Sequence, residues 1–479
     1  MCDRHDLKSV TDLPVPHGET YSAGRQDTIF NIKNLCLSLI LLIAGCAPAQ
    51  QLTYYYAPGE IPHTSRSMKT AGYWISRHPS PDQVILDQKG IERLNRRIRD
   101  EQKLTRDLSA LTAPVSGVEL RQTLLTDWQG TKDAGYYDDR KLKAGDAFFQ
   151  TIQSDMNLDT IPESIPPRYG VILHYADQRI LPMEQGLYAK AGDMDFDELE
   201  NSALDLGTPV VVVHQSSDTQ WLYVYAASSD GWVKADQVAL CSFEDMNRFL
   251  SPENFAVAIR PKVDIYADAA LTKHIDYVQM GARLPMTDGG TEHVIAVDTP
   301  SRNEDGTLRV QTGYVKKSDI SVGYLIYTPR TILEQAFALL NTPYGWGGMY
   351  GEQDCSRFLQ EVYATVGIRL SRNSKAQAQV GEVEAAPAEA TVTEKKNWLN
   401  EHALAGTTLI YMKGHILLFI GTVEGRPYAI HSVWAYRQKG KRGDDVFVLN
   451  RTVVSDLSLG EGSLKGSLLE RMISVNHLK

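Results

Sequence analysis

The sequence predicts a multidomain protein with a helical N-terminal region, two small all-β barrels and a C-terminal α+β domain. The length of 479 residues suits about three or four domains of ~150 residues each. The apolar pattern changes from a helical to a strand period near residue 169. After residue 327 it returns to helices that are followed by strands, which is typical of an α+β domain.

Composition excludes one broad class of partner. The apolar content of 43% and the charged content of 23% are those of an ordinary globular protein. The formal net charge is -10, and no basic stripe exists to neutralise phosphates. We therefore expect no nucleic-acid partner.

Residues 1–45 are predicted to be a signal peptide. The apolar run from Leu35 to Ala44 follows Lys33 and is shorter than the roughly 20 residues that a membrane span needs. Leu-Ile-Ala-Gly-Cys, which ends at Cys46, resembles the lipobox of bacterial lipoproteins. The resemblance implies that Cys46 is lipidated, anchors the protein to a membrane and begins a tether over residues 46–70. The alternative is a buried hydrophobic helix.

Two cysteines would remain in such a mature chain. Cys241 ends the strand-like run QVALC and is expected to fill core. One disulfide between Cys241 and Cys355 is possible in an oxidising compartment, but two cysteines are no disulfide scaffold. Cys355 therefore needs an explanation of its own.

The first predicted region, residues 71–165, is helical. Ile91, Leu94 and Ile98 recur at helical spacing within residues 82–112, and Leu104 and Leu108 continue the pattern. The charged stretch LNRRIRDEQK is read as the solvated face of this pattern.

Residues 166–245 and 246–326 are predicted to form two successive β-barrels. The runs VILHYA, TPVVVVHQ and WLYVYA are rich in β-branched and aromatic residues and are separated by turn residues. GWVKADQV (231–238) and GYVKKSDI (313–320) form a faint internal repeat, and each ends a stretch of short strands. A chance match of two turn-plus-strand segments is the alternative.

Residues 327–479 are predicted to be an α+β domain. Ile332, Leu333 and Ala336 mark a first helix with Thr328 or Thr331 as N-cap, and FLQEVYATVG is a second helix that Gly367 ends. An Ala- and Glu-rich loop at 381–396 precedes strands at TTLIYM, HILLFIGTV and YAIHSVW.

Cys355 falls in the first turn of the second helix, and Asp354 is the expected N-cap. A helix N-terminus favours a thiolate, and its unpaired amides can stabilise an oxyanion. This position predicts a nucleophile. We expect the glycines of YGWGG, which precede it, to let backbone approach a substrate closely.

Two histidines are candidates for the base and its orienting group. His415 and His431 lie on strands that could be neighbours, so their side chains could meet. Cys355 and these histidines could instead bind zinc, but no closely spaced ligand pairs support that. We expect neither a metal nor another cofactor.

Several motifs together resemble the NlpC family of papain-like cell-wall cysteine peptidases that carry two bacterial SH3-like barrels. They are Tyr344-x-Trp-Gly-Gly, Asp354-Cys355-Ser356, Gly414-His415-Ile416 and the later His431. The resemblance implies cleavage of γ-D-glutamyl bonds to diamino acids in peptidoglycan stem peptides. It also implies that Cys355 is the nucleophile, that His415 is the base and that His431 orients His415. The Tyr344 hydroxyl would join the Cys355 amide in the oxyanion hole.

The resemblance also implies contacts to substrate. Asp354 would meet the free ammonium group of an N-terminal L-Ala. Ser356 and Ser374 would hydrogen-bond the D-Glu portion, and Arg372 would pair with its α-carboxylate. The sequence departs from the family at Asn373, where relatives often carry Asp in the substrate-contacting stretch, at Arg357, where many have Gly, and at Lys413, where Pro is common.

The predicted function is that of a lipid-anchored, periplasm-facing cell-envelope peptidase that acts on L-Ala-γ-D-Glu-diamino acid peptides. Two alternatives stay open. The protein could be a non-catalytic lipoprotein that binds cell-wall peptides, or an amidase or acyltransferase on the same fold.

Overall fold

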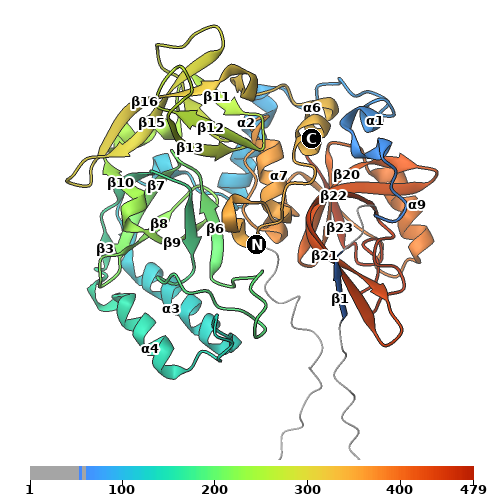
Figure 1. Cartoon of the computed structure of the whole chain (residues 1–479), viewed down its shortest axis with the longest axis horizontal. Coiled ribbons are helices and arrows are strands. Elements are labelled where there is room, and N and C mark those ends of the chain that lie inside the picture. Colours follow the sequence, from blue (N-terminus) through green and yellow to red (C-terminus); the bar gives the residue numbers. More distant parts are fainter. Residues whose placement is uncertain (1–52, 57–60) are drawn as a thin grey trace, which may run out of the picture.

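The computed structural model describes residues 53–56 and 61–479. Figure 1 shows β units in one half and the C-terminal α+β domain in the other, with helix α7 (Cys355–Ala364) between them. The predicted signal peptide and Cys46 lie outside the described residues. Among the residues that are described, no helix combines the length and apolar character needed to cross a bilayer.

The C-terminal domain is built on a seven-stranded sheet in the order β1-β22-β21-β20-β19-β23-β18. Apolar residues alternate between its faces, so Ile416 and Leu418 pack toward α7 while Leu417 and Phe419 pack on the face that α9 covers. The strands are β1 (Thr53–Tyr56), β18 (Glu382–Ala385), β19 (Thr408–Met412), β20 (His415–Val423), β21 (Arg426–Lys439), β22 (Asp444–Asp456) and β23 (Ser474–His477).

The helices of this domain begin where the sequence places capping residues. Thr328 caps α6 (Pro329–Ala338), as predicted, and Thr391 caps α9 (Val392–His402) with a capping box. The short helix α8 (Ser374–Gln377) follows α7. The prediction of a loop at 381–396 is wrong in part, because β18 and the start of α9 lie within these residues.

The first β unit is a seven-stranded sheet in the order β10-β4-β7-β8-β9-β5-β6. Cys241 ends β10 and packs against an apolar cluster, which confirms its predicted place in a core. The strands are β4 (Arg168–Ile172), β5 (Ala176–Arg179), β6 (Glu200–Leu204), β7 (Pro209–Gln215), β8 (Trp221–Tyr225), β9 (Asp230–Lys234) and β10 (Val238–Cys241).

The second β unit has its own core around Val263, Ile265 and Val315. The internal repeat has the same local structure in both units, a strand, a 3-10 turn (Ala235–Gln237 or Lys317–Asp319) and a further strand. Helix α5 (Phe243–Leu250) joins the units. The strands are β11 (Phe255–Ala258), β12 (Lys262–Tyr266), β13 (His274–Gln279), β14 (Arg283–Pro285), β15 (Val294–Arg302), β16 (Leu308–Lys316) and β17 (Ile320–Val322).

The predicted helical region at 71–165 does not form one domain. Trp74 and Ile98 join the core of the C-terminal domain, whereas Leu120 and Phe149 join a core with the first β unit. The helices are α1 (Ala71–Ile75), α2 (Gln88–Arg96) with a π-helical turn (Arg97–Glu101), a 3-10 turn (Leu108–Ala110), α3 (Gly117–Ala134) and α4 (Asp146–Asp155). Short strands β2 (Val115–Ser116) and β3 (Ser164–Ile165) pair beside them.

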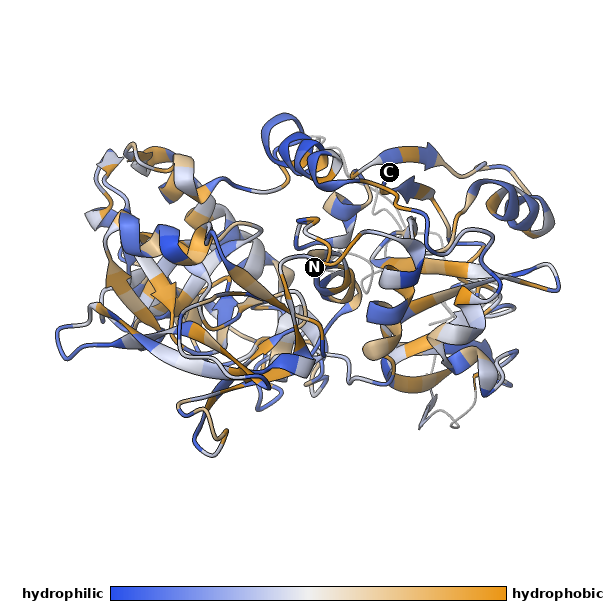
Figure 2. Ribbon diagram, turned by 90° about the horizontal axis from the view of Figure 1, so that it is seen from above, coloured by the Kyte–Doolittle hydropathy of each residue, from blue (hydrophilic) through white to orange (hydrophobic). Residues whose placement is uncertain are grey.

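The last part of the predicted tether is folded as well. Ile61 is buried, and the Tyr428 hydroxyl donates to the carbonyl of His63 at 2.7 Å. The tether expectation is therefore wrong for residues 61–70, which pack on the C-terminal domain. Apolar residues concentrate in the strands of the two halves, and the outer helix faces and loops are mostly hydrophilic (Figure 2).

The glycine-rich turn before Cys355 approaches the first β unit. Gly347 and Gly348 have φ of 66° and 108°, and a Cβ on Gly347 would lie 2.5 Å from Cγ of Glu200 on β6. A Cβ on Gly348 would lie 2.7 Å from Cβ of Ala203, and the Tyr175 hydroxyl donates to the Gly348 carbonyl at 2.6 Å. Gly347 and Gly348 thus approach the β unit closely, and the expected approach of this turn to a substrate stays a prediction.

We predict that Gly347→Ala lowers the thermal unfolding midpoint more than Gly425→Ala does. Gly425 has a similar φ of 72° but no atom within 4 Å of its Cβ position, so that variant carries only the cost of the left-handed backbone, about 1–2 kcal/mol. Gly347→Ala adds the overlap with Glu200, which costs roughly a further 1–3 kcal/mol. Differential scanning calorimetry of both variants measures the difference. Equal midpoints would contradict the docking role.

Candidate active site

The N-terminus of α7 presents Cys355. Asp354 caps the helix as predicted, and its Oδ1 accepts from the amides of Ser356 at 3.1 Å and Arg357 at 2.8 Å. Cys355 is the first residue of the helix and is fully buried, in the same apolar cluster as Ile416 and Ile430. The thiol therefore lies against the strands that carry the two histidines, in the field of a helix N-terminus.

His415 and His431 meet across β20 and β21, as predicted. Nε2 of His415 and Nδ1 of His431 are 2.8 Å apart, and Nε2 of His431 is 3.0 Å from Oγ of Ser455 on β22. The three side chains form a buried chain that fixes the imidazole of His415. Because Nε2 of His415 is engaged, Nδ1 is the nitrogen through which His415 can exchange a proton with a thiol.

Burial keeps both imidazoles neutral. It lowers the pKa of His415 well below 6.5, and the nearby cations Arg471 and Lys465 lower it further. Burial also lowers the pKa of His431 to about 3. A neutral His415 can accept the proton of a thiol, which is what a general base must do.

Asp354 and Arg372 form a buried ion pair. Nη2 of Arg372 donates to Oδ2 of Asp354 at 2.8 Å, and Nη1 donates to Oδ1 at 3.1 Å and to Oγ of Ser356 at 2.9 Å. Burial opposes ionisation of Asp354, but the Arg372 charge holds the pKa of this carboxyl well below its usual range. Ser202 of β6 accepts from Nε of Arg372 at 3.2 Å, so the first β unit contributes to this cluster.

The remaining predicted substrate residues lie at the start of α8. Asn373 is exposed, and its side chain caps this helix by accepting from the Ala376 amide at 2.8 Å. Ser374 is fully buried. Gln377 donates to the Ser356 carbonyl at 2.8 Å and so ties α8 to α7.

A cavity of ≈ 190 Å³ opens beside the histidines and includes residues that the sequence analysis did not place. Tyr344 lines it together with His415 and His431. Phe196, from the first β unit, lies 5.1 Å (ring centroids) from Trp434, 5.3 Å from Trp346 and 6.4 Å from Tyr344. The charged residues that line this cavity are Lys190, Asp193, Lys413, Arg437, Lys465 and Arg471.

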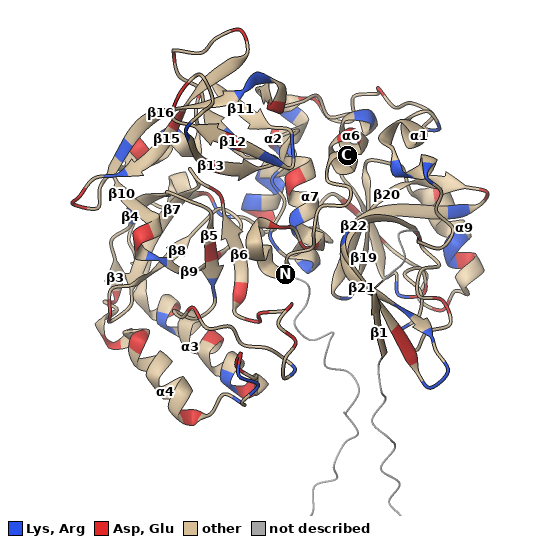
Figure 3. Cartoon of the chain, viewed as in Figure 1, with Lys and Arg blue, Asp and Glu red and all other residues tan. Residues whose placement is uncertain are grey.

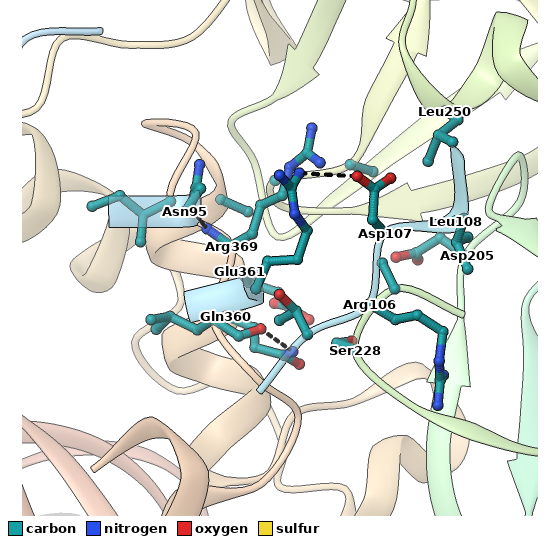
Figure 4. A pocket seen from close by; sticks show the side chains of 18 of the residues that line it. Asn95, Arg106, Asp107, Leu108, Asp205, Ser228, Leu250, Gln360, Glu361 and Arg369 are labelled. Atoms are coloured by element: carbon teal, nitrogen blue, oxygen red, sulfur yellow. Dashed lines mark hydrogen bonds and ion pairs between the residues drawn. The ribbon is translucent and has the colours of Figure 1, made fainter. Parts of the chain in front are cut away.

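A second cavity of ≈ 340 Å³ lies against another face of α7, and Figure 4 shows it from close by. Asn95, Asp107, Asp205 and Glu361 face it from four parts of the chain. Arg357 lines this cavity and not the one beside the histidines, so the large residue that follows Ser356 points away from His415 and His431.

Within residues 53–56 and 61–479, no group of three or more His, Cys, Asp and Glu side chains is arranged to hold a metal ion. The two histidines that could have served as ligands face each other across a hydrogen bond. The arrangement is therefore suited to acid–base exchange between imidazole and thiol.

A cysteine at a helix N-terminus and a histidine pair on an antiparallel sheet are the features expected of a thiol hydrolase site. Residues 341–444 match the model of the NlpC/P60 family, and residues 187–234 match an SH3 domain of the SH3b1 type. The chain thus carries a cysteine peptidase domain of the NlpC/P60 family, whose members are cell-envelope endopeptidases, together with an SH3 domain. Comparison with curated proteins gives no match to this chain.

One solved structure shares the fold of this chain. The chain is similar to a novel NlpC/P60 endopeptidase from Photobacterium damselae subsp. piscicida, with 20% identity and a TM-score of 0.72 over 89% of this chain and 99% of that chain. An NlpC/P60 family protein from Bacillus cereus is 19% identical, with a TM-score of 0.39 over 59% of this chain and 83% of that chain.

We predict that iodoacetamide at pH 7 modifies Cys355 much faster than Cys241. Cys355 is the more buried of the two, but it begins helix α7, whose N-terminus favours a thiolate, whereas Cys241 ends a strand, where burial and the charge of Asp245 raise its pKa to about 12. Peptide mapping by mass spectrometry of a soluble form that starts at residue 50 compares the two thiols. Faster modification of Cys241 would contradict the assignment of Cys355 as the activated thiol.

We predict that His431→Ala lowers kcat for peptide hydrolysis by about 10²-fold or more, with a small change in KM, because His415 loses its orienting partner. The variant should also change the pH profile. Removal of the His431 ring leaves His415 less buried, which raises its pKa, so the acid limb of kcat/KM moves to higher pH. An unchanged limb would contradict the coupling of the two rings.

Proposed function

We propose that the protein is a cysteine endopeptidase that hydrolyses the bond between γ-D-Glu and a diamino acid in peptidoglycan stem peptides with a free N-terminal L-Ala. One observation carries this proposal. An ionised Asp354, paired with Arg372, stands directly before the nucleophile Cys355 in a thiol–histidine site.

The proposed reaction uses the roles expected from the sequence. The Cys355 sulfur adds to the γ-carbonyl carbon of D-Glu after His415 takes the thiol proton. The Tyr344 hydroxyl and the Cys355 amide stabilise the oxyanion. The C–N bond then breaks as His415 returns the proton to the leaving amine, and water hydrolyses the thioester with His415 as base.

The buried ion pair suits the charges of the substrate's first half. L-Ala-γ-D-Glu carries an ammonium group at one end and an α-carboxylate on D-Glu. Asp354 would bind the ammonium group, Arg372 would bind the α-carboxylate, and the hydroxyls of Ser356 and Ser374 would bind the rest of D-Glu. Asn373 would contact substrate from the start of α8. An acylated L-Ala would lose the charged contact to Asp354.

The SH3 domain supports a preference for released fragments. Phe196 and Asp193 come from this domain and line the cavity with His415, so they limit the room for long glycan-linked substrates. Together with the lipid anchor at Cys46, this favours a periplasm-facing enzyme that recycles or turns over wall fragments.

We predict that a soluble form from residue 50 releases L-Ala-D-Glu from L-Ala-γ-D-Glu-meso-diaminopimelate and cleaves the N-acetylated peptide at least ~10-fold more slowly, with both reactions lost in Cys355→Ala. Acetylation is a sharper test than Asp354→Asn, because that variant leaves Arg372 as an unpaired buried charge at roughly 3–5 kcal/mol. Mass spectrometry of the products measures both reactions.

Each other outcome identifies an alternative. Equal cleavage of the acetylated peptide would remove the role of Asp354 and indicate intact wall as substrate. Binding of both peptides without cleavage would favour a non-catalytic binding protein. Transfer of the acyl group to an added amine in place of water would favour an acyltransferase.

A further inference from the structure

The hairpin that joins β21 and β22 ends in a basic tip of three exposed residues, Lys439, Lys441 and Arg442. Within the described part of the chain, none of the three forms an ion pair. Asp444, the first carboxylate after the tip, is paired with Arg437 at 3.6 Å, and Asp445 follows it. The whole chain has a formal net charge of -10 and mixes both signs along both halves of the molecule (Figure 3), so composition does not account for this tip.

Strand β1 lies beside this tip and exposes aromatic side chains there. It pairs in parallel with β22, and Thr53 lies opposite Asp445, directly after the tip. All three tyrosines of β1 are exposed, and Tyr56 is 91% exposed. Leu464 is 70% exposed, and its amide donates to Oδ1 of Asp444 at 3.0 Å, which places it at the same hairpin. One end of the C-terminal domain therefore combines exposed cations with exposed aromatic and aliphatic side chains.

The N-terminal end of β1 is also the end that lies at the tip. This follows from the parallel pairing, because β22 runs away from the tip and Thr53 is opposite its second residue. Cys46, the proposed lipid attachment, stands seven residues before Thr53, and seven residues span at most about 25 Å. A protein anchored through Cys46 would therefore hold this end of the domain close to the bilayer.

We infer that the basic tip and the exposed tyrosines of β1 form a docking surface for an anionic phospholipid membrane. Lysine and arginine side chains bind the phosphates of anionic lipids, and tyrosine rings prefer the level of the headgroups, where the ring is buried and the hydroxyl stays wet. The inference goes beyond the proposed peptidase activity. It takes from the proposed function only the lipid anchor at Cys46, which gives the direction in which the membrane lies.

The docking surface is continuous with the cavity beside His415. Tyr54 of β1 and Val446 of β22 line this cavity, and the ring of Tyr54 lies 6.3 Å from that of Trp434. A lipid on a tether leaves the protein free to rotate, whereas a basic surface beside it supplies the second contact that fixes a protein on a membrane. Docking would therefore hold the cavity at a constant height and orientation next to the bilayer.

The test measures vesicle binding of the soluble form from residue 50, which contains every described residue and no lipid. Its partition coefficient in co-sedimentation should be at least ~10-fold higher for phosphatidylcholine vesicles that contain about 25% phosphatidylglycerol than for pure phosphatidylcholine, and it should fall steeply when salt rises from about 0.1 M to about 0.5 M. Combining Lys439→Gln, Lys441→Gln and Arg442→Gln should lower binding to the anionic vesicles at least ~10-fold, since each cation strengthens such binding by up to about fivefold.

Matched variants separate the docking surface from net charge and from folding. Combining Arg309→Gln, Lys316→Gln and Lys317→Gln removes the same charge types from exposed positions on the second β unit, and it should bind like the wild type. Tyr56→Ser should lower binding about threefold without a change in salt dependence, because its contribution is not ionic. Circular dichroism checks the fold of each variant.

The outcomes are distinct. Wild-type binding that is absent, or equal on both kinds of vesicle, overturns the docking surface, and so does a folded tip variant that binds like the wild type. An equal loss in the Arg309/Lys316/Lys317 variant would assign binding to net charge and also overturn it. Retention on lipid-free polyphosphate without vesicle binding would assign the tip to a soluble polyanion. Cys355→Ala should bind vesicles like the wild type, so a failure of the proposed peptidase activity is seen separately from a failure of docking.

Discussion

The guanidinium group of Arg357 holds α7, the helix that begins at Cys355, against both β units. It donates to Oδ2 of Asp205 at 2.8 Å in the first unit, to Oε1 of Gln279 at 2.8 Å in the second, and to Oε1 of Glu361 at 2.9 Å on α7 itself. A buried cation is tolerated only when its partners are in place, so these acceptors fix where α7 can lie. Burial raises the pKa of Glu361 to about 8 even with Arg357 beside it. Cys355 begins the same helix. Its position therefore depends on the contacts of Arg357, which lie on the side of α7 that faces away from the histidines.

The first β unit acts on the site through a second buried charge. Ser202 of β6 accepts from Arg372, which pairs with the helix cap Asp354, while Glu200 on the same strand packs against the glycine turn. One strand thus contacts the turn before the nucleophile and the ion pair beside it. The SH3 domain thus forms one side of the cavity in the peptidase domain. A separate module that only bound the cell wall would not need such contacts. This explains why Phe196 of the same unit reaches the aromatic rings around the cavity.

Features that depend on local sequence were predictable, and features that depend on long-range packing were not. The cap at Asp354 follows from helix chemistry, and the pairing of His415 with His431 follows from strand alternation, so both geometries could be predicted. The division of the helical region could not, because an amphipathic helix shows that it buries one face but not which core it joins. The glycine turn was predicted to permit a close approach, but the sequence does not say that the partner is Glu200. The cations around His415 are far apart in sequence, and only the fold brings them together.

The charges of Lys465 and Arg471 affect the protonation of the neutral His415. Burial and the charges of Lys465 and Arg471 depress the pKa of His415, so this ring is a weaker base than an isolated imidazole. A bound anion beside these cations would offset their charge and raise the pKa of His415, while burial would continue to lower it. A stronger base accepts the Cys355 proton more readily, and the resulting imidazolium is stabilised next to the anion when it must protonate the leaving amine. A leaving group that carries a carboxylate would then make His415 a stronger base. The preference for that leaving group would affect kcat as well as KM.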